Sequence, residues 1–137
     1  MILSFEYINS FNRLIPICDS CSNYPIGSYV ATYIRLFGKN EFEEKGIYDD
    51  IVNLSIENEF VGFDGIDAFI EGDKVRIGFY LYGKGDEPED YDPEESEFEI
   101  IDRKELIYIL KRWKVFIHKP IIDPHYQEII DTKEAYL

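Results

Sequence analysis

Cysteine, histidine and basic residues are scarce in this 137-residue sequence. Two cysteines are too few for a disulfide scaffold, and two histidines leave few candidates for general acid–base catalysis. The sequence has 14 Lys and Arg residues and 28 Asp and Glu residues, which gives a net charge of −14 at pH 7. Nucleic acids and anionic membranes repel such a chain, so we expect neither as a partner and expect a basic partner instead.

Long hydrophobic runs are also missing. No apolar stretch reaches the roughly 18–20 residues that span a bilayer. The N-terminus lacks the basic and apolar regions of a secretory signal, so we expect a cytoplasmic protein. The length and a hydrophobic content of 45% predict a single domain, residues 1–137, with a substantial core.

Motifs for catalysis and metal binding are absent as well. The sequence has no G-x-S-x-G, P-loop or G-x-G-x-x-G motif. Cys18 and Cys21 form a C-x-x-C, but His118 and His125 lack the spacing that would complete a zinc site. An EF-hand starting at Asp90 would place Glu95 where glycine is required. We therefore expect no enzyme activity, no cofactor and no bound metal.

Apolar periodicity predicts helices in the first half of the chain. Helical spacing favours a helix over residues 5–15, which Pro16 would end. Residues 26–37 also fit a helix, although their Tyr, Val and Ile content suits a strand too. A capping box at Asn40–Glu43 predicts a third helix over residues 42–59.

The second half changes period. Alternating apolar residues on both sides of Gly72-Asp73 predict a β-hairpin over residues 65–83, and residues 96–101 suit a further strand. A capping box at Asp102–Glu105 then opens an amphipathic helix over residues 102–118. The predicted fold class is α+β, with an antiparallel sheet packed against helices on one face.

The negative charge is concentrated between Lys84 and Glu99, where nine carboxylates accompany a single base. Two prolines prevent a regular helix or central strand there. A solvated loop is one interpretation; the other is a mobile acidic arm that steers a cationic partner and uses a tyrosine as anchor. The candidate partner-binding residues of this arm are Asp86, Glu87, Glu89, Asp90, Tyr91, Asp92, Glu94, Glu95 and Glu97.

A second candidate surface combines tyrosines with acids elsewhere in the chain, because tyrosine-rich surfaces suit tight interfaces. Its members are Tyr48, Asp49, Asp50, Tyr80 and Tyr82.

The middle and C-terminal parts of the chain carry a family resemblance. It rests on Asn58-Glu59-Phe60, on the hairpin segments at 65–70 and 75–80, and on Phe98–Ile101 leading into Asp102–Leu106. Over roughly residues 40–120 the chain resembles the small acidic immunity proteins of bacterial contact-dependent growth inhibition systems, the CdiI type. The resemblance implies a protein that binds and neutralises a ribonuclease toxin by covering its active site or an adjacent face, without chemistry of its own.

Two other functions stay open at this point. A self-associating or adaptor protein would set the basic stripe Lys111, Arg112 and Lys114 against the acidic arm of a second copy, although a solvated helix face explains the stripe equally simply. A weak hydrolase is the remaining alternative. The oligomeric state does not follow from the sequence.

Overall fold

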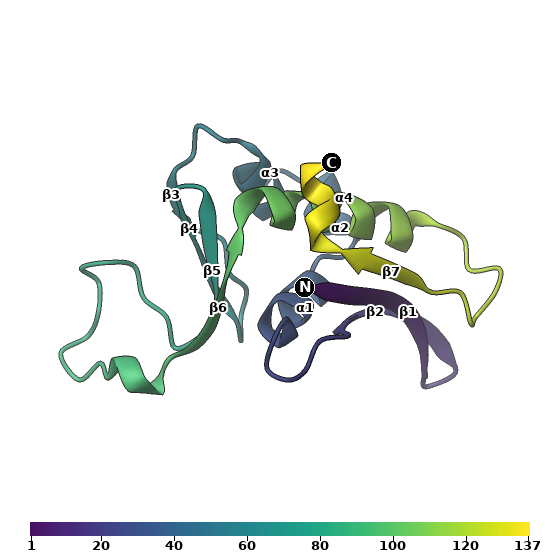
Figure 1. Cartoon of the computed structure of the whole chain (residues 1–137), viewed down its shortest axis with the longest axis horizontal. Helices are drawn as coiled ribbons and strands as arrows, with labels where there is room; N and C mark the ends of the chain where they lie inside the picture. Colours follow the sequence, from purple (N-terminus) through teal and green to yellow (C-terminus); the bar gives the residue numbers. More distant parts are fainter.

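Two antiparallel sheets, rather than the single predicted sheet, form the frame of the protein. The computed structural model describes residues 1–137 and places helices between and beside the sheets, so the α+β class is confirmed (Figure 1). The core is continuous and draws buried residues from both sheets and from the helices α1 (Ser28–Arg35) and α4 (Arg103–His118). None of the helices combines the length and the apolar character needed to cross a membrane.

The first sheet has the order β2-β1-β7 and corrects the prediction of a helix over 5–15. That segment belongs instead to the hairpin of β1 (Ile2–Ser10) and β2 (Arg13–Ser20), and β1 also pairs with β7 (Glu128–Asp131). Phe11 and Asn12 make the turn, both with positive φ, at 51° and 62°. Pro16 lies in the edge strand β2, where the absence of its N–H is tolerated.

The second sheet has the order β3-β4-β5-β6 and confirms the predicted hairpin and its third strand. Its strands are β3 (Asn58–Phe60), β4 (Asp67–Glu71), β5 (Lys74–Phe79) and β6 (Glu97–Asp102). Gly72 turns the β4–β5 hairpin with a φ of 67°. Alternate residues point to the core from the inner face, namely Ala68, Ile70, Val75, Ile77 and Ile101.

Helix α1 confirms the helix predicted over 26–37 and joins the two sheets, because it packs against β2 as well as β5 and β6. A carboxylate from β6 caps its N-terminus. Glu99 accepts hydrogen bonds from the backbone N–H groups of Gly27 at 2.5 Å and Tyr29 at 2.9 Å. Negative charge is favourable at this end of a helix, so the cap fixes α1 to the second sheet.

The single helix predicted over 42–59 is wrong. Two short helices, α2 (Lys39–Glu43) and α3 (Ile47–Val52), replace it, and β3 follows them. Gly46 lies between the two helices, and its N–H donates a hydrogen bond to the Asp49 carboxylate in the first turn of α3. The capping box predicted at Asn40 is also wrong, because Asn40 lies inside α2.

Helix α4 confirms the helix predicted over 102–118 and buries Leu106, Ile109, Leu110, Trp113 and Phe116. The Trp113 ring meets Phe5 of the first sheet edge-on at 5.0 Å, and its indole N–H donates to the Phe37 carbonyl at 2.7 Å. The capping box predicted at Asp102 does not form. The Asp102 side chain accepts instead from Lys74 and from Tyr136, which lies in the 3₁₀ helix η2 (Thr132–Tyr136).

Arg103, the first residue of α4, is 3% exposed and contacts no carboxylate. Its guanidinium donates five hydrogen bonds to backbone carbonyls, those of Asp50, Ile51, Asn53, Ile56 and Gly72. Burial lowers the pKa of Arg103, which nevertheless stays far above neutrality. One side chain thus joins the end of α3, the chain entering β3 and the β4–β5 turn.

We predict that Arg103→Met lowers the free energy of unfolding by about 3 kcal/mol or more, because five backbone carbonyls, one buried and four partly buried, lose a charged donor. Lys111→Met, at an exposed position of the same helix, is the matched control and changes stability by less than about 0.5 kcal/mol. Urea unfolding of both variants measures the difference. Equal stability of the two variants contradicts the role given to Arg103.

The β1–β2 turn yields a prediction of the opposite sign. A bulky residue in the left-handed region is strained, and the two-residue turn of a hairpin prefers Asn-Gly. The double variant Phe11→Asn with Asn12→Gly should therefore raise stability by about 1 kcal/mol. Thermal unfolding tests this, with Phe11→Ala as a control that keeps the strain; a double variant no more stable than that control contradicts the explanation.

Candidate functional site

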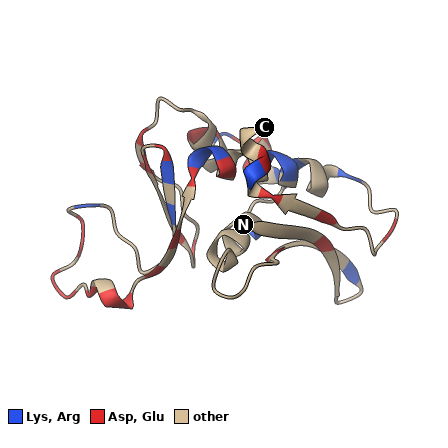
Figure 2. Ribbon diagram, in the orientation of Figure 1, with Lys and Arg blue, Asp and Glu red and all other residues tan.

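The acidic segment forms a long loop between β5 and β6 and extends away from the helices (Figure 1). It contains the short 3₁₀ helix η1 (Pro93–Glu95), and acidic residues follow one another along it (Figure 2). Eight of the nine candidate arm residues are exposed, and only Tyr91 is half-buried. The exposed members are Asp86, Glu87, Glu89, Asp90, Asp92, Glu94, Glu95 and Glu97.

No ion pair neutralises these carboxylates. The salt bridges of the protein all lie elsewhere, and Lys84 takes part in none of them. Three of the carboxylates accept hydrogen bonds from nearby groups: Glu87 from the Gly85 N–H, Asp92 from the Glu94 N–H and Glu97 from the Tyr29 hydroxyl. The loop therefore presents its full negative charge to solvent.

Three tyrosines pack together at the base of the loop. The ring centroids of Tyr80, Tyr82 and Tyr91 lie 5.2 to 5.4 Å apart. Tyr91 was assigned to the arm and the other two to the second candidate surface, so the structure merges parts of both predicted sites. The middle of the loop is folded back by contacts that the prediction of a mobile arm did not include.

Polar side chains fix both ends of the loop. Asp67 accepts from the Leu81 N–H at 3.0 Å, and Arg76 donates to the Tyr82 carbonyl at 3.0 Å. At the other end the Ser96 hydroxyl donates to the Tyr80 carbonyl at 2.9 Å and lies 2.8 Å from the Tyr91 hydroxyl. Sequence analysis missed Asp67, Arg76 and Ser96, because side-chain bonds to a distant backbone leave no local pattern.

Tyr80 has a φ of 58°, which is unusual for a bulky side chain. Such a conformation is unfavourable by about 1 kcal/mol or more and persists only where the surroundings impose it, commonly at functional sites. Desolvation, followed by the proximity of Tyr82 and Asp90, raises the pKa of Tyr80 above its ordinary value. The hydroxyl therefore remains a neutral hydrogen-bond donor beside the acidic loop.

The rest of the second candidate surface does not join this cluster. Tyr48 is half-buried on α3, packed edge-on against Phe42 at 4.9 Å, with the Lys114 ammonium 5.9 Å above its ring. Asp49 serves as the partner of the Gly46 N–H, and the backbone of Asp50 accepts from Arg103. These three residues stabilise the α2–α3 region.

The basic stripe on α4 is partly occupied within the chain. Arg112 pairs with Glu128 at 3.0 Å and donates to the Tyr108 hydroxyl at 2.9 Å, while Lys114 lies over Tyr48. Lys111 and Lys114 are exposed without an ion pair, although Lys114 has the Tyr48 ring beside it. The stripe thus offers less free positive charge than the sequence suggests.

The cysteines occupy unequal environments. Cys18 is buried in β2, where desolvation raises the pKa of its thiol far above the ordinary value, and Cys21 is exposed beyond the strand. A raised thiol pKa is opposite to the lowered value that redox motifs require. No group of three or more His, Cys, Asp or Glu side chains is arranged to hold a metal ion.

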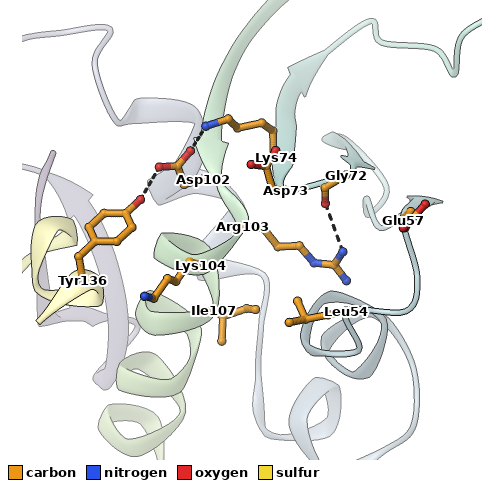
Figure 3. A pocket seen from close by; sticks show the side chains of 10 residues that line it. All are labelled: Leu54, Glu57, Gly72, Asp73, Lys74, Asp102, Arg103, Lys104, Ile107 and Tyr136. Carbon is orange, nitrogen blue, oxygen red and sulfur yellow. Dashed lines mark hydrogen bonds and ion pairs between the residues drawn. The ribbon is translucent and has the colours of Figure 1, made fainter.

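An open hollow of about 740 Å³ lies between the end of α3, the β4–β5 turn and the start of α4 (Figure 3). Two of its charged side chains already have partners. Arg103 reaches away to backbone carbonyls, and Asp102 binds both Lys74 and Tyr136. The other charged lining residues, Glu57, Asp73 and Lys104, are exposed and of mixed sign, so the acidic loop with its tyrosine cluster is the stronger candidate site.

We predict that Tyr91→Ala loosens the loop, whereas Tyr91→Phe, the matched control, keeps the ring contacts and loosens it far less. Each aromatic pair contributes about 0.5–1.5 kcal/mol, so loss of two pairs should speed cleavage within residues 84–95 by a Glu-specific protease about tenfold or more. Similar cleavage rates for Tyr91→Ala and the unaltered protein would show that the cluster does not hold the loop.

A comparison with known protein families covers nearly the whole chain. A family model described as "Family of unknown function (DUF5376)" matches residues 1–136. No solved structure matches significantly.

Several proteins of Pasteurella multocida (strain Pm70) are similar in sequence to this chain, at different levels of identity. UPF0275 protein PM0489 is 98% identical over the full length of both chains. UPF0275 protein PM0493 is 49% identical over all of this chain and 98% of its own, and UPF0275 protein PM0504 is 37% identical over 82% of this chain and 76% of its own. Because the family model matches residues 1–136, the chain belongs to the DUF5376 family.

Proposed function

We propose that this protein is an immunity protein that binds and neutralises a bacterial toxin, a basic ribonuclease domain, in the cytoplasm. In this proposal the acidic loop covers the active site of the toxin or an adjacent face. The observation that carries the proposal is the exposed, unpaired carboxylate series of the loop beside the cluster of Tyr80, Tyr82 and Tyr91.

The electrostatic argument starts from the toxin. A ribonuclease must attract a polyanion, so its substrate groove is positively charged. A dense acidic loop is attracted to the same positively charged groove as the RNA. Its charge raises the rate of association with the toxin, over a distance set by the ionic strength. Because no base within the chain neutralises these carboxylates, their charge remains available to a partner.

The tyrosine cluster supports the same function. Tyrosine is enriched among the residues that dominate binding energy, since a large rigid ring is buried while the hydroxyl finds a polar partner. Holding Tyr80, Tyr82 and Tyr91 together before binding lowers the entropy lost on association.

The relatives in one strain are a further support. Proteins with 98%, 49% and 37% identity to this chain occur in Pasteurella multocida (strain Pm70). Several diverged copies are what a set of inhibitors with different individual partners requires, because specificity is a difference between affinities that each copy must set separately.

The direct test is co-expression with the product of the adjacent upstream gene, which the proposal expects to be the toxin. We expect cell survival, a nanomolar complex on co-purification and loss of nuclease turnover in its presence. Toxicity that persists, together with no complex at micromolar concentrations, contradicts the proposal.

A second prediction concerns rates. Neutralising four loop acids, with Asp86→Asn, Glu87→Gln, Glu89→Gln and Asp90→Asn, should slow association with that toxin about tenfold at low salt and change dissociation little. The matched control removes four charges elsewhere, by Gln substitution of Glu6, Glu41, Glu44 and Glu57. Stopped-flow mixing separates the two; equal slowing by both variants means that the loop is not the contact.

A further inference from the structure

The outer face of the four-stranded sheet is apolar and uncovered. Phe60, Phe98 and Ile100 point away from the core and are 46%, 45% and 58% exposed. They alternate along their strands with residues of the inner face, and the helices lie on that inner side (Figure 1). Phe60 lies on the edge strand β3, and Phe98 and Ile100 lie on the opposite edge strand β6. Exposed apolar side chains gathered on one face commonly mark an interaction surface.

Arg76 occupies the centre of this face, but its charge is already balanced. The guanidinium pairs with Glu71 at 3.0 Å and lies over the Phe69 ring, 5.3 Å from the centroid. Lys74, the other base of β5, pairs with Asp102. The face therefore presents aromatic surface without a free positive charge.

The acidic loop begins on the same face. Its first residues are held by Asp67 and Arg76, both of which point outward from the sheet, and Gly83 lies so close to Phe69 that an added Cβ would be 3.5 Å from that ring. Between them runs a shallow groove of about 580 Å³, lined on the sheet side by Phe60, Phe69 and Glu71 and on the loop side by Gly83, Lys84 and Asp86. Aromatic face and acidic loop are thus the two walls of one groove.

We propose that this groove and the adjoining sheet face dock a basic protein segment that carries two apolar side chains, one packing on Phe60 and Phe69 in the groove and the other on Phe98 and Ile100 at the β6 edge, while its cationic neighbours face the loop. Charge complementarity selects this occupant, because the unpaired carboxylates of Glu59 and Asp86 line the groove against the single base Lys84, and unpaired acids continue along the loop. A second copy of the chain is disfavoured, since each copy carries a net charge of −14.

Charge and apolar contact then act at different stages of binding. Exposed charges chiefly set the rate of encounter, whereas buried apolar anchors chiefly set the rate of dissociation. This inference deepens the proposed function, because it names the surface that would retain the toxin once the loop has attracted it.

The test uses two synthetic octapeptides with the intact protein. One consists of lysines with phenylalanine at positions three and six; the other has serine at those two positions. We expect the phenylalanine peptide to bind at least about fivefold more tightly, because partial burial of an aromatic ring contributes about half of its full transfer free energy. Amide chemical shifts should move in residues 58–60, 67–71 and 98–100 as well as in the loop.

A matched pair of variants locates the apolar contact. Ile100→Ser removes an isoleucine that is 58% exposed on β6, and Ile129→Ser removes one that is 55% exposed on β7 of the other sheet. Ile100→Ser should reduce the preference for the phenylalanine peptide to less than about twofold, and Ile129→Ser should leave it unchanged. Thermal unfolding of both variants verifies that they remain folded.

The outcomes separate the two proposals. Equal affinity for the two peptides, or an equal effect of the two variants, overturns the docking surface. Toxin neutralisation that survives Ile100→Ser with an unchanged dissociation rate also overturns the surface while leaving the proposed function intact. A peptide preference that depends on Ile100, in a protein that binds no toxin, supports the surface and contradicts the toxin function.

Discussion

The buried guanidinium of Arg103 is the contact on which the arrangement of the second sheet depends. The last carbonyls of a helix have no partner within the helix, and those at the end of α3 point toward the Arg103 guanidinium. One side chain at the start of α4 satisfies them and also binds the β4–β5 turn. The position of the strands, and hence of the loop that joins β5 to β6, follows from this junction.

Local pattern was sufficient where neighbouring residues decide the structure. Alternation around Gly72-Asp73 predicted the β4–β5 hairpin, and the heptad-like spacing from Leu106 predicted α4. It failed at residues 5–15, where Phe5, Ile8 and Phe11 fit a helical period although the segment is a hairpin. Pairing of β1 with β7, more than 120 residues away, outweighs that local preference.

The site divides in the same way. Composition alone located the acidic segment with Tyr91, because charge density is a property of the sequence, but it assigned Tyr80 and Tyr82 to a different surface. The anchoring of that segment by Asp67, Arg76 and Ser96 depends on which residues the fold brings together. The outward Phe69, Phe98 and Ile100 did leave a signal, since they place apolar residues on the strand positions where a half-exposed sheet usually carries polar ones.

Because Asp67, Arg76 and Ser96 bind the backbone of residues 80–82 and the Tyr91 ring holds the middle of the loop, its path depends little on the side chains from residue 84 to residue 90. Substitutions from residue 84 to residue 90 can alter charge and shape without moving the strands or exposing the core. Such a loop can evolve quickly while the scaffold stays the same. Relatives as distant as 37% identity can then keep one scaffold while this loop differs between them.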